Sequence, residues 1–214
     1  MLAAIEQALG AALAAGAGCI GEIAIRKTNS GFVIMHRDDV DRTDLEIMDP
    51  TAIAKFDDHG KYRPLKTAPN LRRGWQIELA DLSALARAID YIYPGRLAAF
   101  AAWKGGELVV TSLRETLNRQ SGMYRVAAQI SDEQIDDVVA NFCRSDGGCL
   151  RTILWKRDVA GTTPSTKLPV TKFDVAHDQT GDTKACSSTG LIPLICQEAC
   201  NLLVNECRKV VKSE

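Results

Sequence analysis

The sequence predicts an α+β protein, in which a small N-terminal unit of one helix and a β-meander is followed by a mainly helical domain that carries most of the cysteines. Two patterns predict the first part: an alanine-rich helical run near the N-terminus, and short apolar segments separated by turn residues. Apolar residues at helical spacing in the second half predict the cysteine-bearing part. The 214 residues are 46% hydrophobic and 25% charged, which is typical of a globular protein with a core.

The N-terminal unit begins with a helix expected over residues 3–15, which two glycines end. Apolar segments at 20–25 and 32–35 flank the turn sequence Thr-Asn-Ser-Gly at 28–31, and this pattern predicts a β-hairpin. A third strand is expected at 45–47. One helix followed by three short strands predicts a small meander that packs on the helix.

An aspartate-proline pair at 49–50 predicts a short helix that ends near residue 56, because proline is favoured in the first turn of a helix. Residues 61–75 then combine prolines, an asparagine and a glycine with little periodicity. We place the domain boundary in this stretch. Residues 1–73 are expected to form the small α+β domain, and residues 74–214 the cysteine-bearing domain.

The second domain begins with a helix expected over residues 81–91, and a proline-glycine pair separates it from a shorter helix that ends near residue 103. A strand is expected over residues 107–111, and the stretch after it is too polar for a core element. Ser131 and Gln134 then form the capping-box pattern, in which each side chain bonds the backbone of the other residue. This pattern predicts the start of a further helix.

Two pairs of cysteines are the feature that points to chemistry. Cys143 and Cys149 follow the capped helix, and the five residues between them include two glycines that let the loop fold back. Cys196 and Cys200 lie four positions apart on a final helix expected over residues 193–211, which places both thiols on one face about one turn apart. Four thiolates from two pairs are the ligand set of a tetrahedral zinc ion or of a cubane iron-sulfur cluster.

The spacing of the cysteines favours an iron-sulfur cluster over zinc. Paired zinc ligands are usually separated by about two to four residues and often include histidine. Here the first pair has five residues between its members, and none of the three histidines stands at ligand spacing to a cysteine. The alternatives are structural zinc in an interaction module, thiols that bind no metal, and an enzyme that uses a reactive cysteine.

The three remaining cysteines are expected to lie outside the ligand set. Cys207 falls on the same face of the expected final helix but about 10 Å further along its axis, so we interpret it as a core residue. Cys186 lies in a polar stretch without periodicity and is interpreted as an exposed loop thiol that could also swing towards the site. Cys19 is interpreted as a small buried hydrophobe at the start of a strand.

The overall charge and the lengths of the apolar segments indicate which partners and which cell compartment to expect for the protein. The net charge of −1 shows no electrostatic footprint for nucleic acid or an anionic membrane. No uncharged apolar run of about 18 residues would span a bilayer. The N-terminal run carries Glu6 and no basic leader, so it predicts an amphipathic helix and not a signal peptide. We expect a cytoplasmic protein, where cysteines serve metal binding or catalysis more often than disulfides.

Several short motifs together resemble a known family. They are Arg114-Glu115-Thr116 followed by Gly122-Met123-Tyr124-Arg125, Cys143 with Cys149-Leu150-Arg151 and Leu154-Trp155, and the closing Cys196-Gln197-Glu198-Ala199-Cys200. They resemble the iron-sulfur domain attached to CbiX-type sirohydrochlorin chelatases in some bacteria. Tyr62-Arg63-Pro64-Leu65 and Gly74-Trp75 resemble the smaller stabilising domain that accompanies it.

The resemblance implies one 4Fe-4S cluster bound by Cys143, Cys149, Cys196 and Cys200. It also implies a redox or accessory role beside a tetrapyrrole chelatase of the cobalamin or sirohaem pathway. The chelatase domain, with its metal-inserting histidines, has no counterpart in this sequence, so chelation by this chain alone is not expected. The expected partner is a separately encoded chelatase or an electron-transfer protein.

Basic and aromatic residues near the first cysteine pair are the remaining candidates. The set is Arg114, Arg119, Tyr124, Arg125 and Arg151. They would tune the cluster, because positive charge and hydrogen bonds to sulfur raise its potential, or grip the carboxylates of a tetrapyrrole. The alternative is ordinary surface charge paired with Glu115, Asp132 and Glu133. Tyr124, Trp155 and Trp103 are expected to be core or shielding residues, and a tryptophan that keeps water from a cluster is the sharper form of that hypothesis.

Overall fold

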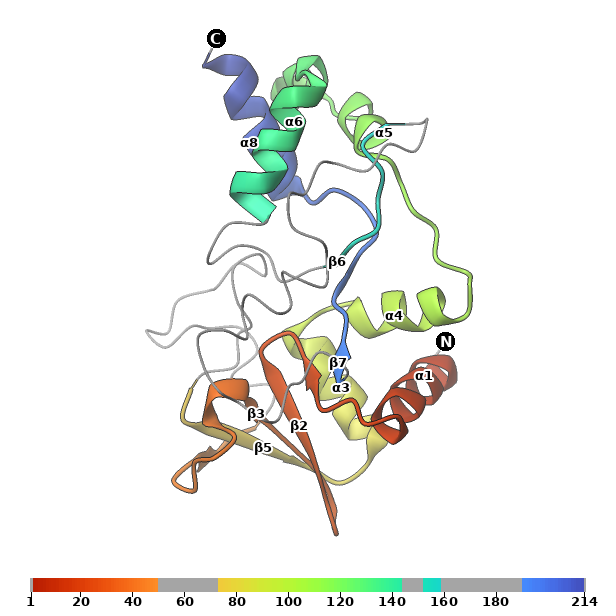
Figure 1. The fold of residues 1–214 in the computed structure, drawn as a ribbon, viewed down its shortest axis with the longest axis vertical. Coiled ribbons are helices and arrows are strands. Elements are labelled where there is room, and N and C mark those ends of the chain that lie inside the picture. The colour runs from red at the N-terminus through yellow and green to blue at the C-terminus, as the bar shows by residue number, and fades with distance from the viewer. Residues whose placement is uncertain (1, 50–72, 144–151, 159–189, 214) are drawn as a thin grey trace. The chain divides into compact units, whose positions relative to one another are not determined.

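The computed structural model describes residues 2–49, 73–143, 152–158 and 190–213. Their contacts divide the chain into two compact units. The first unit takes its described residues from within 1–107 and 174–194, and the second from within 108–173 and 195–214 (Figure 1). Each unit is described by itself. The helix expected at 49–56 lies outside the described residues, apart from Asp49.

The first unit contains a six-stranded mixed sheet with the order β4-β5-β3-β2-β1-β7. Its strands are β1 (Cys19–Ile20), β2 (Ile23–Thr28), β3 (Gly31–His36), β4 (Glu46–Ile47), β5 (Trp75–Leu79) and β7 (Leu191–Ile192). The predicted hairpin is confirmed, since β2 pairs antiparallel with β3 in a register that sets Ile25 opposite Ile34. At its turn only glycine fits, because a Cβ atom on Gly31 would lie 2.1 Å from the carbonyl oxygen of Leu79.

The third predicted strand is present as β4, but it pairs parallel with β5 and not with the hairpin. β5 itself pairs antiparallel with β3, from Leu79 opposite Phe32 to Gln76 opposite Met35. The domain boundary expected after residue 73 therefore falls inside this sheet, between β4 and β5. The contacts divide the chain at residue 107 instead.

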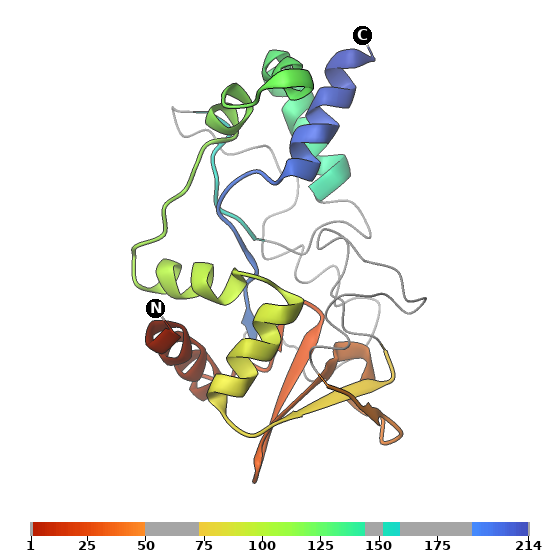
Figure 2. The ribbon, with the colours of Figure 1, turned by 180° about the vertical axis from the view of Figure 1, so that it is seen from behind.

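The described part of the first unit also contains the helices α1 (Leu2–Ala14), α3 (Leu82–Ile92) and α4 (Arg96–Lys104). All three were expected. The α3 helix begins at Asp81, whose side chain accepts a hydrogen bond of 2.7 Å from the backbone N–H of Ala84. It packs against β3 and β5, while α1 packs against α3 and α4 (Figure 2). The face of α3 turned to this core carries Leu85 and Ile89, both fully buried.

The second unit is mainly helical, as predicted (Figure 1). Its elements are α5 (Leu113–Asn118), the 3₁₀ segment η2 (Gly122–Gln129), α6 (Asp132–Val138), the π-helical turn η3 (Val139–Cys143), β6 (Thr152–Ile153), β8 (Ile195–Cys196) and α8 (Asn201–Lys212). α6 packs against α8, and η2 packs against both α5 and α8. β6 and β8 form a separate two-stranded parallel sheet.

Two expectations about the start of this unit are wrong. Residues 107–111 form no strand, and Val109 is 78% exposed. The polar stretch after it does contain a core element, α5. Ser112 and Glu115 form a capping box that begins this helix, and Leu113 and Leu117 are fully buried beneath its polar face.

The final helix also differs from the prediction. It begins at Asn201 and not near residue 193. The segment before it is extended because Cys196 belongs to β8, whose backbone pairs with β6, and because Cys200 is the N-cap with φ −78° and ψ 158°. The two cysteines therefore do not share one face of a helix.

Candidate metal centre

Cys143 is positioned by the capped helix that the sequence predicts. The hydroxyl of Ser131 accepts a hydrogen bond from the backbone N–H of Gln134 at 3.2 Å, and the side chain of Gln134 accepts one from the N–H of Ser131 at 2.8 Å. This fixes the start of α6, and apolar residues at helical spacing fix its rotation, with Ile135 fully buried. The helix continues through the π-helical turn and ends at Cys143, whose side chain is buried.

The second pair is positioned by strand pairing and by a helix terminus. Cys196 lies opposite Ile153 in the parallel pair of β6 and β8, and its carbonyl accepts a 3.0 Å hydrogen bond from Leu154. Cys200 precedes α8, and its carbonyl accepts the first helical hydrogen bond from Val204 at 3.1 Å. Cys196 is buried and Cys200 is partly buried.

All three described ligand candidates lie in or against one apolar core, called here the second-unit core. Its buried members are Leu113, Leu117, Ala127, Ile130, Ile135, Val138, Val139, Cys143, Trp155, Cys196, Ala199, Leu203, Val204 and Cys207. Cys200 packs against this set. Segments separated by about fifty residues of sequence thus bring their thiols to one core, as the two-pair hypothesis requires.

Trp155 makes a direct contact with one of these sulfurs. Its side chain is only 1% exposed, and its indole N–H donates to Sγ of Cys196 across 3.3 Å. The thiol of Cys196 in turn donates to the carbonyl oxygen of Glu198 at 3.3 Å. The sequence predicted a buried or shielding tryptophan at this position, but the contact depends on the β6–β8 pairing and had no signal in the local pattern.

The other cysteines fall into separate classes. Cys207 is fully buried in α8, and burial raises the pKa of its thiol to about 12, so it stays neutral and serves the core as expected. Cys19 is fully buried in the first unit, as expected, and contrary to the expectation for a reducing compartment it is disulfide-bonded. Cys149 and Cys186 lie outside the described residues.

The donors that are described fit a thiolate-bound cluster in their chemistry. Within the described ranges, no group of three or more histidine, cysteine, aspartate or glutamate side chains is close enough to hold a metal ion, and the expected fourth ligand, Cys149, lies outside them. The fit rests on the kind of donor: three cysteine sulfurs in or against an apolar core, with an indole N–H directed at one of them. Iron-sulfur clusters are held by such thiolates, with hydrogen bonds to sulfur from their surroundings.

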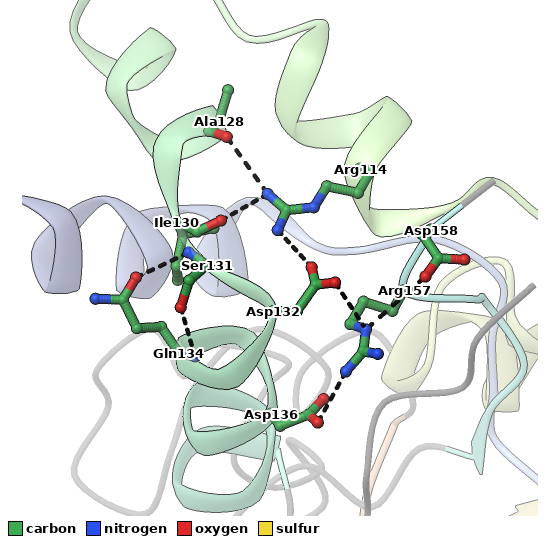
Figure 3. Close-up of polar contacts among 9 residues, drawn as sticks. All are labelled: Arg114, Ala128, Ile130, Ser131, Asp132, Gln134, Asp136, Arg157 and Asp158. Carbon is green, nitrogen blue, oxygen red and sulfur yellow. Dashed lines mark hydrogen bonds and ion pairs between the residues drawn. The ribbon is translucent and has the colours of Figure 1, made fainter. Parts of the chain in front are cut away.

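Arg114, a candidate for cluster tuning, is committed to other partners. One terminal nitrogen donates to the carbonyl oxygen of Ile130 at 2.7 Å, and the other pairs with Asp132 at 2.5 Å (Figure 3). Arg157, which the sequence did not single out, pairs with Asp136 at 2.9 Å and lies 3.8 Å from Asp132. Both arginines therefore form ion pairs with carboxylates of α6. For Arg114 and Asp132, this is the pairing that the surface-charge alternative predicted.

The other basic and aromatic candidates that the structure describes are exposed. Tyr124 is 38% exposed and Trp103 is 41% exposed, so the expectation of a core position is wrong for both. Arg119 donates from Nε to the backbone carbonyl of Glu115 at 3.3 Å. Arg208 lies over the ring of Tyr124, 5.3 Å from its centroid. Arg125 is exposed on η2, and none of the described residues forms a hydrogen bond or ion pair with its side chain. Arg151 lies outside the described residues.

Comparison with known proteins finds a matching family model for each half of the chain. Residues 105–209 match the family model of a 4Fe-4S iron-sulfur cluster binding domain, and residues 7–104 match that of the DR2241 stabilising domain. The chain is thus similar to a stabilising domain over its first half and to a 4Fe-4S cluster-binding domain over its second half. The junction of the two models lies within a few residues of the division between the two compact units.

One similar solved structure is DR2241 from Deinococcus radiodurans, with a TM-score of 0.69 and 28% sequence identity. The match covers 97% of this chain but 42% of that one, so the chain spans less than half of the length of this relative. It is described as a multi-domain protein with structural similarity to chelatases and with two additional novel domains. No curated protein matches the chain.

The described part of the chain also bears on the membrane question. None of its helices combines the length and the apolar character needed to cross a bilayer.

Proposed function

We propose that the chain binds one 4Fe-4S cluster through Cys143, Cys149, Cys196 and Cys200. The observation that carries this proposal is that Cys143 and Cys196 belong to one apolar core against which Cys200 packs, in a part of the chain that matches a 4Fe-4S cluster-binding domain. When bound, such a cluster supplies one-electron transfer. The chain's own contribution is to hold the sulfurs and to keep water away from them.

Three structural features would hold the sulfurs in place. The capping box and π-helical turn position Cys143, the β6–β8 pairing positions Cys196, and the N-terminus of α8 positions Cys200. The N-terminus of α8 also favours negative charge, because its first backbone N–H groups point outward with a positive partial charge.

We further propose that the chain works as a redox or accessory partner of a CbiX-type tetrapyrrole chelatase. Support comes from the relative DR2241, in which counterparts of these two domains belong to a larger protein with similarity to chelatases. Here the cluster would exchange electrons with, or stabilise, a chelatase encoded separately.

The exposed candidates are better suited to binding this partner than to tuning the cluster. Arg114 is held by Ile130 and Asp132, whereas Arg125 is exposed and has no such partner among the described residues. We therefore assign Arg119, Tyr124 and Arg125 to contact with the partner or with the carboxylates of its tetrapyrrole.

The test is the iron, sulfide and zinc content of protein purified without oxygen, with its visible spectrum. About four irons per chain and a brown colour are expected, and both should be lost in a Cys196→Ala, Cys200→Ala double variant. A Cys207→Ala variant is the matched control, since that thiol is buried and neutral, and it should keep its iron. A colourless protein with one zinc would instead support the zinc-clamped module.

A further inference from the structure

We propose that Trp155 sets the reduction potential of the cluster by donating its indole N–H to the sulfur of Cys196. This inference rests on the proposed function, because it assigns a role towards the bound cluster. The observation is the 3.3 Å contact between Nε1 of Trp155 and Sγ of Cys196. An indole has one donor and no acceptor, so this geometry has only one direction.

Backbone hydrogen bonds on both sides hold Trp155 in this position. On one side, the N–H of Leu154 donates to the carbonyl of Cys196 at 3.0 Å. On the other, the carbonyls of Lys156 and Arg157 accept from Leu113 and Arg114 at 2.8 and 3.0 Å. The strand β6 and the helix α5 thus fix the chain before and after the indole. The ring does not need to be ordered when a cluster binds.

Because Trp155 is buried, its indole N–H needs the contact with the sulfur of Cys196 as a hydrogen-bond partner. Trp155 is 1% exposed and belongs to the second-unit core, so water does not compete for its N–H. A buried donor without a partner carries a large desolvation cost, and the sulfur of Cys196 removes that cost. The core around the contact is apolar, and Leu203 and Val204 of α8 belong to it.

The consequence for a cluster follows from charge. Reduction adds one electron, and part of the added negative charge resides on the sulfurs. A donor directed at a ligand sulfur stabilises the reduced state more than the oxidised state, and so raises the potential. An apolar surrounding has the opposite effect, since it disfavours the more highly charged state. The indole N–H therefore offsets part of the decrease in reduction potential that the apolar core around Cys196 causes.

The test compares Trp155→Phe with the matched control Trp103→Phe. Trp103 lies on α4 of the first unit, is 41% exposed and has its ring centroid 6.2 Å from that of Phe100. Both variants and the wild type are reconstituted without oxygen, their iron and sulfide are counted, and the midpoint potential is measured by redox titration with electron paramagnetic resonance. Trp155→Phe should keep the cluster at a lower potential, and Trp103→Phe should match the wild type.

A second measurement avoids a change of shape. Wild-type protein grown with 5-fluorotryptophan keeps nearly the same ring but has a more acidic N–H, so its potential should rise. This comparison stands even where Trp155→Phe folds poorly, as circular dichroism would show.

Three results would overturn the inference. Equal potentials in Trp155→Phe and wild type, at full iron content, would do so while leaving the cluster in place. Loss of iron from a folded Trp155→Phe variant, with no shift in the fluorinated protein, would make the residue a structural support. A wild type that takes up no iron would remove the proposed function as well, which the iron count distinguishes from the first two.

Discussion

The two cysteine-bearing regions of the second unit are built in different ways. Cys143 ends a helix whose start and rotation are fixed by neighbours in sequence, namely the Ser131–Gln134 capping box and the apolar face of α6. Cys196 is placed by a strand about forty residues away, through the pairing of β8 with β6. Local chemistry thus positions the first thiol, and long-range pairing positions the second. If the two regions are independent, a substitution that weakens one should leave the other intact.

The largest effect is expected at the region that depends on pairing. Ile195 precedes Cys196 in β8 and is fully buried. Ile195→Ala should lower the free energy of unfolding by about 2–5 kcal/mol, because it removes buried methyl groups and leaves a cavity. Urea denaturation of the metal-free protein measures this change. The iron content should fall as well, since β8 then no longer holds Cys196 firmly.

The matched control for this change is Leu202→Ala, on α8, where the side chain is 41% exposed. It should cost far less, because little of the leucine is removed from water in the folded state. Equal losses in the two variants would show that β8 does not depend on its buried side chain.

A smaller effect is expected where a distant residue supports the locally built region. Arg114→Met keeps the aliphatic stem but removes the donors to the carbonyl of Ile130 and to Asp132. The carbonyl of a buried residue then loses its partner, so the free energy of unfolding should fall by about 1–3 kcal/mol. The pair with Asp132 adds little, because that carboxylate is half exposed. Arg119→Met, which removes an exposed arginine, is the control in the same denaturation experiment.

The difference between the regions also explains how much the sequence could predict. The hairpin, the helices α3 and α4 and the capped helix ending at Cys143 were predictable, because glycine turns, caps and apolar periodicity act over a few residues. The start of α8 was not. Cys196 and Cys200 stand at helical spacing, but the backbone of Cys196 gains strand bonds from a segment far away in sequence, and no local pattern records that gain.

The same limit applies to the candidate site. The number and spacing of the cysteines were enough to propose two ligand pairs. The interpretation of Cys207 as a core residue is confirmed, since its side chain is fully buried. The contact of Trp155 with Cys196 and the role of Arg157 at α6 both join residues more than twenty positions apart. Such contacts follow from the fold, and the spacing of residues in the sequence does not contain them.

The locally built region can be weakened by itself through its cap. Ser131→Ala removes the acceptor for the N–H of Gln134, which should cost about 1 kcal/mol of unfolding free energy. Ser121→Ala is a close control, because Ser121 is the N-cap of η2 but makes no capping hydrogen bond with its side chain. If the regions are independent, iron content stays near that of the wild type in both variants. Loss of iron in Ser131→Ala alone would show that the site depends on the cap.

The smallest effect on stability is expected for arginines that belong to neither region. Arg119→Gln and Arg125→Gln together should change the free energy of unfolding by less than about 0.5 kcal/mol and leave the iron content unchanged, since both side chains are exposed. The affinity for a purified CbiX-type chelatase should nevertheless fall. The difference in affinity from the wild type should become smaller as salt is added, because salt screens the attraction between exposed charges at the rim of an interface. Calorimetry or surface plasmon resonance at two salt concentrations measures this. Unchanged binding would remove these arginines from the proposed partner contact, and a large loss of stability would instead place them with Arg114, among the side chains that hold the fold.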